Sequence, residues 1–229
     1  MSDHDPYAFL SPAAVVVDDR FQPLLRSPIE AAHVTAGAAI EEHEGWRIAV
    51  YENGAAGPWL SDLSHLGTLD LRGTESELEE LTGGLAPGQA RADGDIWTLR
   101  LTPTHGYVVC PFTRVGELRA RIGAAAVDAS CGLAAVALGG EGWREVWMRS
   151  SGLDAREQSF GPGRCLAGSV MRAQTIAVNL GEHVLMLVGW EFAEYFWEAL
   201  LDAGAEIGLV PVTLGVGAGE IVGQEVGAG

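Results

Sequence analysis

The sequence contains no lysine, only three cysteines and no long uninterrupted apolar run. Its 14 basic residues, all arginines, stand against 31 aspartates and glutamates, which gives a formal net charge of −17 at pH 7. Because such a chain repels phosphates, we expect no nucleic-acid partner. The acidic residues form small clusters, at residues 41–44 and 75–80 for example, which is typical of a solvated surface. Residues 178–190 are apolar but interrupted by polar side chains, so we expect no membrane span.

The cysteines, Cys110, Cys131 and Cys165, are odd in number and form no CxxC pair. The N-terminal residues also lack a basic segment followed by an apolar core, which a secretory signal would need. We therefore expect a cytoplasmic protein with reduced thiols. The histidines show no pair at metal-ligand spacing and no cysteine joins them, so we expect no metal site.

The most informative local pattern lies in residues 60–73, LSDLSHLGTLDLRG. The leucine-rich run at residues 66–71 is bounded by glycines, which predicts a strand entering a buried sheet. Before this strand, Asp62 and Ser64 are able to bind local backbone amides, and His65 stands beside the first buried residue. We therefore expect polar side chains where a sheet edge faces a pocket.

One order of elements, namely strand, helix, hairpin and helix, occurs twice along the chain. The copies span residues 66–123 and 133–204, which predicts an α/β (α+β) fold of two pseudo-duplicated halves. The first copy is predicted to contain a strand at 66–71, a helix at 75–81, hairpin strands at 95–101 and 106–110, and a helix at 115–122. The second is predicted to contain a strand at 133–138, a helix at 142–148, strands at 170–178 and 183–188, and a helix at 192–203.

Two further elements are expected before the first copy. Ser27 as a cap and Pro28 in the first turn predict a helix that runs to about Ala39. Alternating apolar and polar residues predict a strand at residues 46–51. The expected organisation is an N-terminal arm over residues 1–25, one domain over residues 26–214, and a glycine-rich tail over residues 215–229.

Several short motifs between Arg26 and Gly73 resemble a known family in their order and register. They are carried by Ser27, Pro28, His33, Gly37, Gly45, Trp46, Asp62, Ser64, His65, Asp70, Arg72 and Gly73. This order resembles the glycine cleavage system T-protein, the folate-dependent aminomethyltransferase family. The second half resembles the gamma subunit of heterotetrameric sarcosine oxidase, through Phe160, Gly163, Cys165, Phe192, Tyr195, Leu200 and Leu201.

The resemblance implies the folate-binding domain of an aminomethyltransferase without its C-terminal barrel. It implies a protein of one-carbon metabolism that binds tetrahydrofolate or a similar ligand and assists aminomethyl, methylene or methyl transfer from a small amine or one-carbon donor. Whether the chain is itself an aminomethyltransferase-like enzyme stays open. One alternative is a noncatalytic gamma-type subunit of a sarcosine oxidase-like, amine-demethylating complex, packed against a larger folate- or flavin-bearing subunit. Another is recruitment of the fold to a different reaction in a specialised pathway.

The resemblance also implies a cofactor site. By this likeness Asp95 is the catalytic residue, because a carboxylate in a pocket of limited polarity accepts or donates a proton at the pterin and stabilises a developing positive charge. The likeness also implies that Asp95, Tyr107 and His65 bind the cofactor. The ordinary alternatives are a turn residue for Asp95, a half-buried strand aromatic for Tyr107 and a turn-bound histidine for His65. Leu185 and Val212 replace polar family residues, which weakens pterin recognition because buried polar atoms need partners.

Tyr195, Phe196 and Trp197 are consecutive in the last predicted helix, so their side chains point in different directions. At least one of them is therefore expected at the surface, where a subunit interface is the simplest explanation. The other aromatic residues of the second half are expected mostly in the core.

Overall fold

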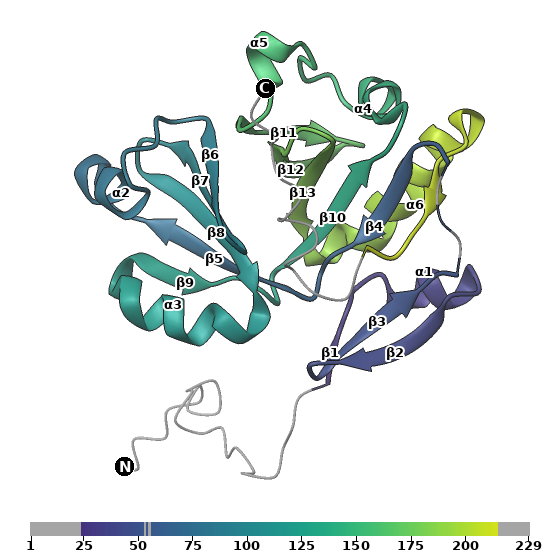
Figure 1. Cartoon of the computed structure of the whole chain (residues 1–229), viewed down its shortest axis with the longest axis horizontal. Coiled ribbons are helices and arrows are strands. Elements are labelled where there is room, and N and C mark those ends of the chain that lie inside the picture. Colours follow the sequence, from purple (N-terminus) through teal and green to yellow (C-terminus); the bar gives the residue numbers. More distant parts are fainter. Residues whose placement is uncertain (1–23, 53, 55, 215–229) are drawn as a thin grey trace, which may run out of the picture.

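The computed structural model describes residues 24–52, 54 and 56–214, which form three β-sheets with helices packed against them (Figure 1). The N-terminal sheet contains, in spatial order, β1 (Leu25–Arg26), β3 (Trp46–Val50) and β2 (Ala39–His43). The first-half sheet contains β6 (Gln89–Asp93), β7 (Ile96–Thr102), β8 (His105–Pro111), β5 (Leu66–Arg72) and β9 (Ala126–Asp128). The second-half sheet contains β11 (Cys165–Val170), β12 (Ala173–Asn179), β13 (His183–Gly189), β10 (Leu133–Gly139), β4 (Trp59–Asp62) and β14 (Val210–Pro211).

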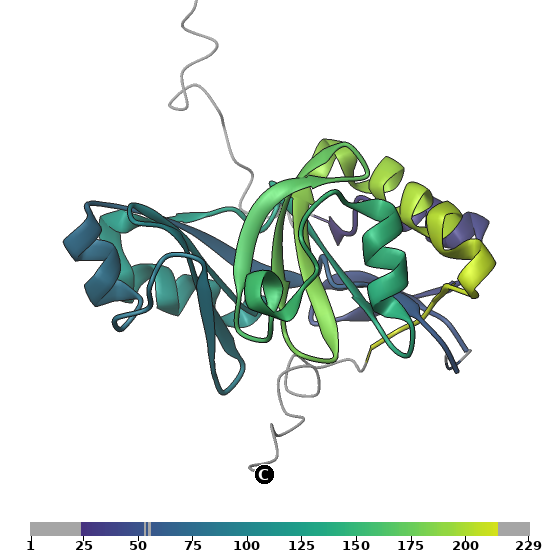
Figure 2. The same ribbon diagram turned by 90° about the horizontal axis from the view of Figure 1, so that it is seen from above.

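Helices cover the outer faces of the two larger sheets, and these sheets face each other in the middle of the molecule (Figure 1 and Figure 2). The first half contains α2 (Glu75–Leu81) and α3 (Val115–Ile122), the second contains α4 (Trp143–Ser150), α5 (Glu157–Phe160) and α6 (Ala193–Gly204), and α1 (Glu30–Thr35) lies beside the N-terminal sheet. Short 3-10 helices adjoin these elements at Phe112–Arg114, Gly123–Ala125, Trp190–Phe192 and Ala205–Ile207. Strand, helix, hairpin and helix follow one another in both halves, so the predicted pseudo-duplicated α/β fold is confirmed.

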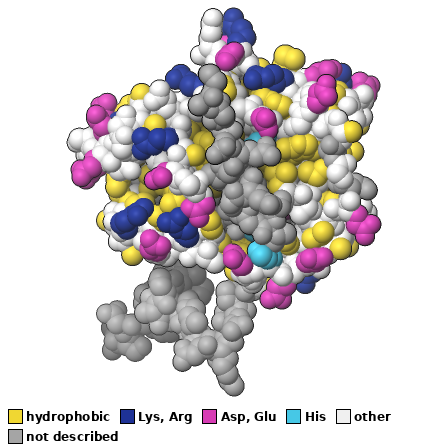
Figure 3. All heavy atoms as spheres, in the orientation of Figure 1, with side chains coloured by type: hydrophobic (Ala, Val, Ile, Leu, Met, Phe, Trp, Pro, Cys, Tyr) yellow, Lys and Arg dark blue, Asp and Glu magenta, His cyan; other side chains and the backbone are white. Residues whose placement is uncertain are grey.

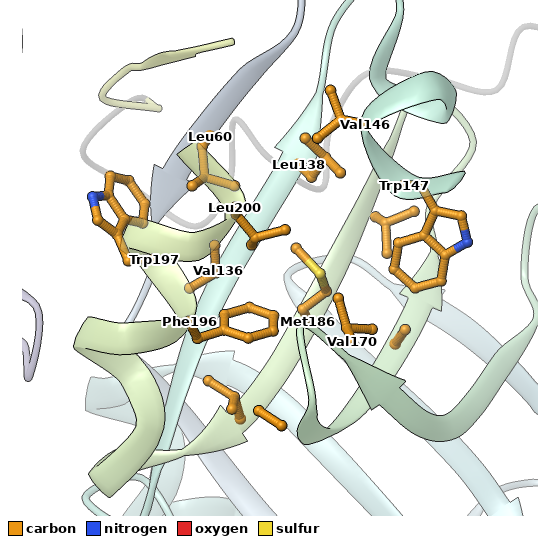
Figure 4. Packing of buried hydrophobic residues seen from close by; sticks show 14 of the residues in the cluster. Leu60, Val136, Leu138, Val146, Trp147, Val170, Met186, Phe196, Trp197 and Leu200 are labelled. Carbon is orange, nitrogen blue, oxygen red and sulfur yellow. The ribbon is translucent and has the colours of Figure 1, made fainter. Parts of the chain in front are cut away.

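Strand β10 contributes to two cores at once. Its side chains alternate, so Val136 and Leu138 face the helices while Ala135 and Ala137 face the other sheet. On the helical side, Phe196 of α6 packs in the same cluster as Val136 and Leu138 (Figure 4). A strand that is buried on both faces must be apolar throughout, which explains the run of alanine, valine and leucine.

The apolar layer between the two sheets, here called the inter-sheet core, joins the halves. Small and medium side chains fill it from both sides, and their burial stabilises the pairing of the halves by roughly 25 cal/mol per Å² of apolar surface removed from water. Its members include Leu66, Leu99, Tyr107 and Val109 from the first half and Ala135, Ala137, Ile176, Val178, Leu185 and Leu187 from the second.

Helix α1 is shorter than predicted. It begins at Glu30 rather than directly after Ser27, and the Ser27 hydroxyl accepts the Ile29 amide at 3.0 Å. The chain leaves the helix at Gly37, whose φ of +84° suits glycine, and Ala39 then starts β2. The prediction of a helix to Ala39 was wrong because pairing with β3 outweighs the helical spacing of the alanines.

Strands β6 and β11 were also missed. Strand β6 has the polar sequence QARAD and is largely exposed, so it lacks the apolar run by which strands are recognised. Its hairpin with β7 turns at Gly94 and Asp95. The next hairpin turns through two residues, Pro103 and Thr104, and not through the expected four. Strand β11, of which only Val170 falls within a predicted strand, pairs with β12.

The predicted arm ends inside β1 at Leu25, and residues 1–23 and the tail 215–229 lie outside the described residues. Among the described helices, none has both the length and the apolar character needed to cross a membrane. Acidic side chains are scattered over the face in Figure 3 instead of forming one patch, in agreement with the small clusters in the sequence.

Candidate functional site

The Asp-x-Ser-His turn connects β4 of the second-half sheet to β5 of the first-half sheet. Asp62 Oδ1 accepts the Ser64 amide at 2.9 Å and the Ser64 hydroxyl at 2.6 Å, so the predicted local bonding is present. The Ser64 hydroxyl oxygen in turn accepts the Ala135 amide of β10 at 3.3 Å. These bonds fix the crossing of the chain from one half to the other.

A buried chain of polar groups extends from Asp62 to the N-terminal region. His33 of α1, 1% exposed, places Nε2 at 2.9 Å from Asp62 Oδ2 and Nδ1 at 2.8 Å from the Tyr51 hydroxyl. His33 thus bridges the Asp62 carboxylate and the Tyr51 hydroxyl, with Nε2 as the donor to the carboxylate. The ring of Trp197 packs edge-on against His33, with 4.7 Å between centroids.

The two ends of this row of polar groups, Asp62 and Tyr51, differ in their charge. Burial acts to raise the pKa of Asp62, but hydrogen bonds and charge from His33, with help from Ser27 and Ser64, outweigh it and lower the pKa. Burial, followed by the charge of Asp62, raises the pKa of Tyr51 to about 12. The carboxylate is thus ionised and the phenol is a neutral donor. The arrangement ties α1, β3 and β4 together.

His65 lies beside this chain in the same turn and is partly buried. Burial lowers the pKa of His65, the charge of Asp62 opposes that shift, and the nearby His43 adds to it. A neutral imidazole results, which suits a proton acceptor. The role of His65 in cofactor binding stays a prediction.

Asp95 lies in the turn between β6 and β7 and pairs with Arg114, which follows β8. Each of the two side chains is 33% exposed, so this is a partly solvated surface ion pair. Asp95 thus lies where the noncatalytic alternative given above puts it, in a turn. Its proposed catalytic role requires that a ligand displace Arg114.

Tyr107 lies in β8 directly opposite Asp70 of β5, and it is 6% exposed. Burial, followed by the charge of Asp70, raises the pKa of Tyr107 to about 12, so the phenol is neutral. His105 Nε2 lies 3.0 Å from Asp70 Oδ1, and Arg72 donates to both oxygens of Asp70 at 2.9 and 3.2 Å. We call Asp70, Arg72, His105 and Tyr107 the β5–β8 cluster.

The structure does not bring Asp95 and Tyr107 together. Trp97 is paired with Val109, so Asp95 lies near the end of β8, about four residues or about 13 Å along the strand from Tyr107. Asp70 is the carboxylate that neighbours Tyr107. Alternation in the LDLR segment puts Asp70 on the sheet face opposite to Leu69 and Leu71, but the pairing with Tyr107 depends on the strand register.

The residues present do not fit a pterin in the manner that the T-protein resemblance implies. Leu185 is 3% exposed and packed in the inter-sheet core, and Val212 is 8% exposed with its amide bound to Leu60 O at 2.9 Å. Neither position offers a polar partner, and Asp95 already has one in Arg114. Within the described residues, no group of His, Cys, Asp and Glu side chains is arranged to bind a metal ion.

Comparison with known proteins gives a family and a fold. The sequence profile of the "Sarcosine oxidase, gamma subunit family" matches residues 84–206, which is more than half of the chain. A chain of heterotetrameric sarcosine oxidase from Corynebacterium sp. U-96, in complex with pyrrole 2-carboxylate, is similar with a TM-score of 0.63 and 21% identity, over 80% of this chain and 96% of that one.

The glycine cleavage system aminomethyltransferase T from Bartonella henselae is also similar, with a TM-score of 0.67 and 18% identity over 83% of this chain. The match covers 60% of the aminomethyltransferase, so this chain spans only part of the length of that protein. At these identities the two structures show the fold. No curated protein sequence matches the chain.

Proposed function

The chain belongs to the sarcosine oxidase gamma subunit family, and from that premise we propose that it is the small, noncatalytic subunit of an amine-demethylating complex. The observation on which this depends most is the profile match over residues 84–206. The similarity to one chain of a heterotetramer along 96% of that chain supports it. The larger partner would bind the flavin and the folate and would act on the small amine.

Exposed apolar side chains on the helices of the second half support a partner there. Tyr195 of α6 is 50% exposed and Phe192, just before α6, is 49% exposed, whereas Phe196 and Trp197 are buried. Met148 of the neighbouring α4 is 61% exposed. Large apolar groups gathered on one layer are typical of a protein interface, so we assign this layer to the larger subunit.

The test is co-purification with the flavoprotein encoded by a neighbouring gene. Introducing two negative charges into this apolar surface by Phe192→Glu together with Tyr195→Glu is expected to weaken the complex at least tenfold. Val127→Glu in β9 is the matched control, because Val127 is 58% exposed on the other half. If the chain elutes alone from co-expression, or if the two substitutions leave the complex intact, the proposal fails.

A second candidate is that this chain itself binds tetrahydrofolate, with Asp95 as the acid or base and Tyr107 and His65 at the pterin. The observation that favours it is the carboxylate and phenol pair of Asp70 and Tyr107, which borders the inter-sheet core. The fit at Asp95 and Leu185 is poor, so we expect the isolated chain to release no heat on titration with tetrahydrofolate. Binding that is lost in both Tyr107→Phe and Asp95→Ala would establish this candidate instead.

We also propose a cytoplasmic location. Cys131 is exposed, and Cys110 and Cys165 are buried, and all three have free thiols. Reduced thiols are ordinary in the cytoplasm. Fractionation of the native cells with an antibody to this chain tests the assignment, and recovery from the periplasm or culture medium would contradict it.

A further inference from the structure

The second half has a surface hollow of about 460 Å³ at the edge of the helical layer that we assign to the larger subunit. It lies where the tip of the β11–β12 hairpin meets the end of α4 and one side of α6. Pockets for small ligands commonly measure about 300–1,000 Å³, so the hollow is large enough for a small molecule. Its lining includes Arg149, Ser150, Leu153, Met171, Arg172 and Tyr195.

The floor of this hollow is apolar and well fixed. The Met171 amide donates to Ser150 O at 2.8 Å, which ties the hairpin tip to the last turn of α4. Leu153 covers Gly168 of β11 so closely that an added Cβ would lie 2.5 Å from the leucine Cδ2. Met171 also packs against the helix-facing core. A floor tied in this way presents a preformed surface to an apolar group.

The guanidinium group of Arg172, which has no acidic partner among the described residues, gives the hollow a positive side. Arg149 and Arg172 both line it, and none of the described lining residues is acidic. Arg149 donates to Glu145 at 2.9 Å and to Glu206 at 3.0 Å, but the Glu206 side chain is 85% exposed. Among the described residues, no carboxylate lies within ion-pair distance of Arg172. In a chain of net charge −17, an arginine without an acidic neighbour favours the binding of an anion.

The backbone fixes Arg172 at the rim. Met171 and Arg172 form the two-residue hairpin turn with φ values of +46° and +65°, a conformation that usually takes Asn and Gly. Tyr195 also lines the hollow and is 50% exposed. The hollow therefore combines a cation, an exposed aromatic ring and an aliphatic floor.

We propose that this hollow binds a small carboxylate with an apolar body. The carboxylate would be held by the guanidinium of Arg172, with Arg149 as second donor once Glu206 swings away, because guanidinium and carboxylate form paired hydrogen bonds. The apolar body would pack on Leu153, Met171 and Tyr195. Because Tyr195 also belongs to the layer assigned to the larger subunit, the proposal is tested on the isolated full-length chain, in which that layer is uncovered.

The test is an NMR titration of the 15N-labelled chain with benzoate and, in parallel, with the neutral benzamide. Benzoate is expected to shift the amide signals of the hollow residues saturably and to bind at least tenfold more tightly than benzamide. Arg172→Gln should weaken benzoate binding at least tenfold. Arg121→Gln is the matched control, since Arg121 is an exposed arginine on α3 of the other half, and it should change the affinity less than twofold.

Two further variants make the outcome decisive. Glu206→Gln removes the competitor of the ligand for Arg149, so it should strengthen benzoate binding about threefold. Tyr195→Ala should weaken binding while leaving the hairpin intact, and it serves as the test if Arg172→Gln does not fold. Equal affinities for benzoate and benzamide, or unchanged affinity in both Arg172→Gln and Tyr195→Ala, would overturn the proposal.

Discussion

Each half of the molecule contains an Asp-x-Ser turn at the point where the chain crosses to the other half. Asp62 binds the amide and hydroxyl of Ser64, and Asp128 binds the amide and hydroxyl of Ser130 at 3.0 and 2.6 Å. Only Asp62 is continued by a buried histidine, His33. The two halves therefore share the hydrogen bonding of the turn, whereas a buried histidine accompanies the turn at Asp62 and not the turn at Asp128.

A second pair of equivalent positions points the same way. In the first half Asp70 lies opposite Tyr107, and in the second half Ala137 lies opposite Leu185 at the same place in the strand pairing. The β5–β8 cluster therefore has an aliphatic counterpart that is sealed in the inter-sheet core. At these equivalent positions, the polar side chains able to contact a ligand come from the first half, and the second half contributes apolar side chains to the inter-sheet core.

The largest expected effect concerns the helix-facing cores. Phe196 is the fourth residue of α6 and Leu118 the fourth residue of α3, and both are buried. We expect Phe196→Ala to lower the free energy of unfolding by about 4 kcal/mol and Leu118→Ala by about 3 kcal/mol, because each leaves a cavity. Urea unfolding followed by circular dichroism measures both.

The shape of these unfolding curves also tests the unity of the fold. Because the inter-sheet core joins the halves, each variant should show one transition with an unchanged slope against urea concentration. Two separate transitions, with only one shifted in each variant, would mean that the halves are independent units.

The next effect concerns the sealed position in the second half. Leu185→Glu restores the acidic residue that the aminomethyltransferase resemblance implies, but it puts a carboxylate where Leu185 is 3% exposed. We expect the free energy of unfolding to fall by about 3 kcal/mol at pH 7, since a buried charge without a partner is costly.

The pH dependence of this variant has a definite sign. Burial raises the pKa of the new carboxyl above its value in the unfolded chain, so protonation relieves the penalty. Destabilisation should therefore be largest near neutral pH and shrink toward pH 4. Leu185→Gln is the matched control, and its loss of unfolding free energy should not vary between neutral pH and pH 4. Full stability of the Glu variant at pH 7 would show that a polar partner or solvent reaches this position.

A smaller effect is expected at the crossing turns. Asp62→Asn removes the charge that His33 faces, and we expect a loss of about 2 kcal/mol at pH 7. Asp128→Asn is the matched control and should cost about 0.5 kcal/mol, because Asp128 is exposed and belongs to the turn without the histidine.

The stability difference between the unchanged chain and Asp62→Asn should depend on pH. The folded pKa of Asp62 is lowered from 3.8, so its carboxylate stabilises the fold above that value and stops doing so as the pH falls toward the folded pKa. The difference in the free energy of unfolding should be constant near neutral pH and should disappear below about pH 4. A difference that persists unchanged to pH 2 would assign the effect to shape and not to charge.

Regular apolar patterns made most of this fold predictable. The runs at residues 66–71 and 133–138 are strands, β5 and β10, because both lie in the middle of sheets and are buried. Strands β2 and β6 could not be predicted in the same way, since they are polar, exposed edge strands whose partners come from outside their own sequence.

The candidate site was less predictable because it depends on register. In the structure the carboxylate beside Tyr107 is that of Asp70 from β5, whereas Asp95 lies in the turn between β6 and β7, and the roles of Asp95, Tyr107 and His65 stay predictions. One missed feature could have been read from the chain, since Asp-x-Ser is repeated at Asp62 and Asp128 and marks both crossings. That His33 meets Asp62 depends on tertiary packing, which no local pattern contains.

The smallest expected effect separates the two roles considered for Asp95. As a partly solvated partner of Arg114 it should contribute no more than about 0.5 kcal/mol, so Asp95→Ala should barely change the free energy of unfolding. Arg114→Ala and the double variant close a cycle that measures the coupling of the pair. A catalytic Asp95 would behave differently, because Asp95→Ala would then abolish a tetrahydrofolate-dependent reaction that Arg114→Ala preserves. A small coupling energy together with unchanged turnover of the assembled complex would leave Asp95 as the turn residue of β6 and β7, and would place the chemistry outside this chain.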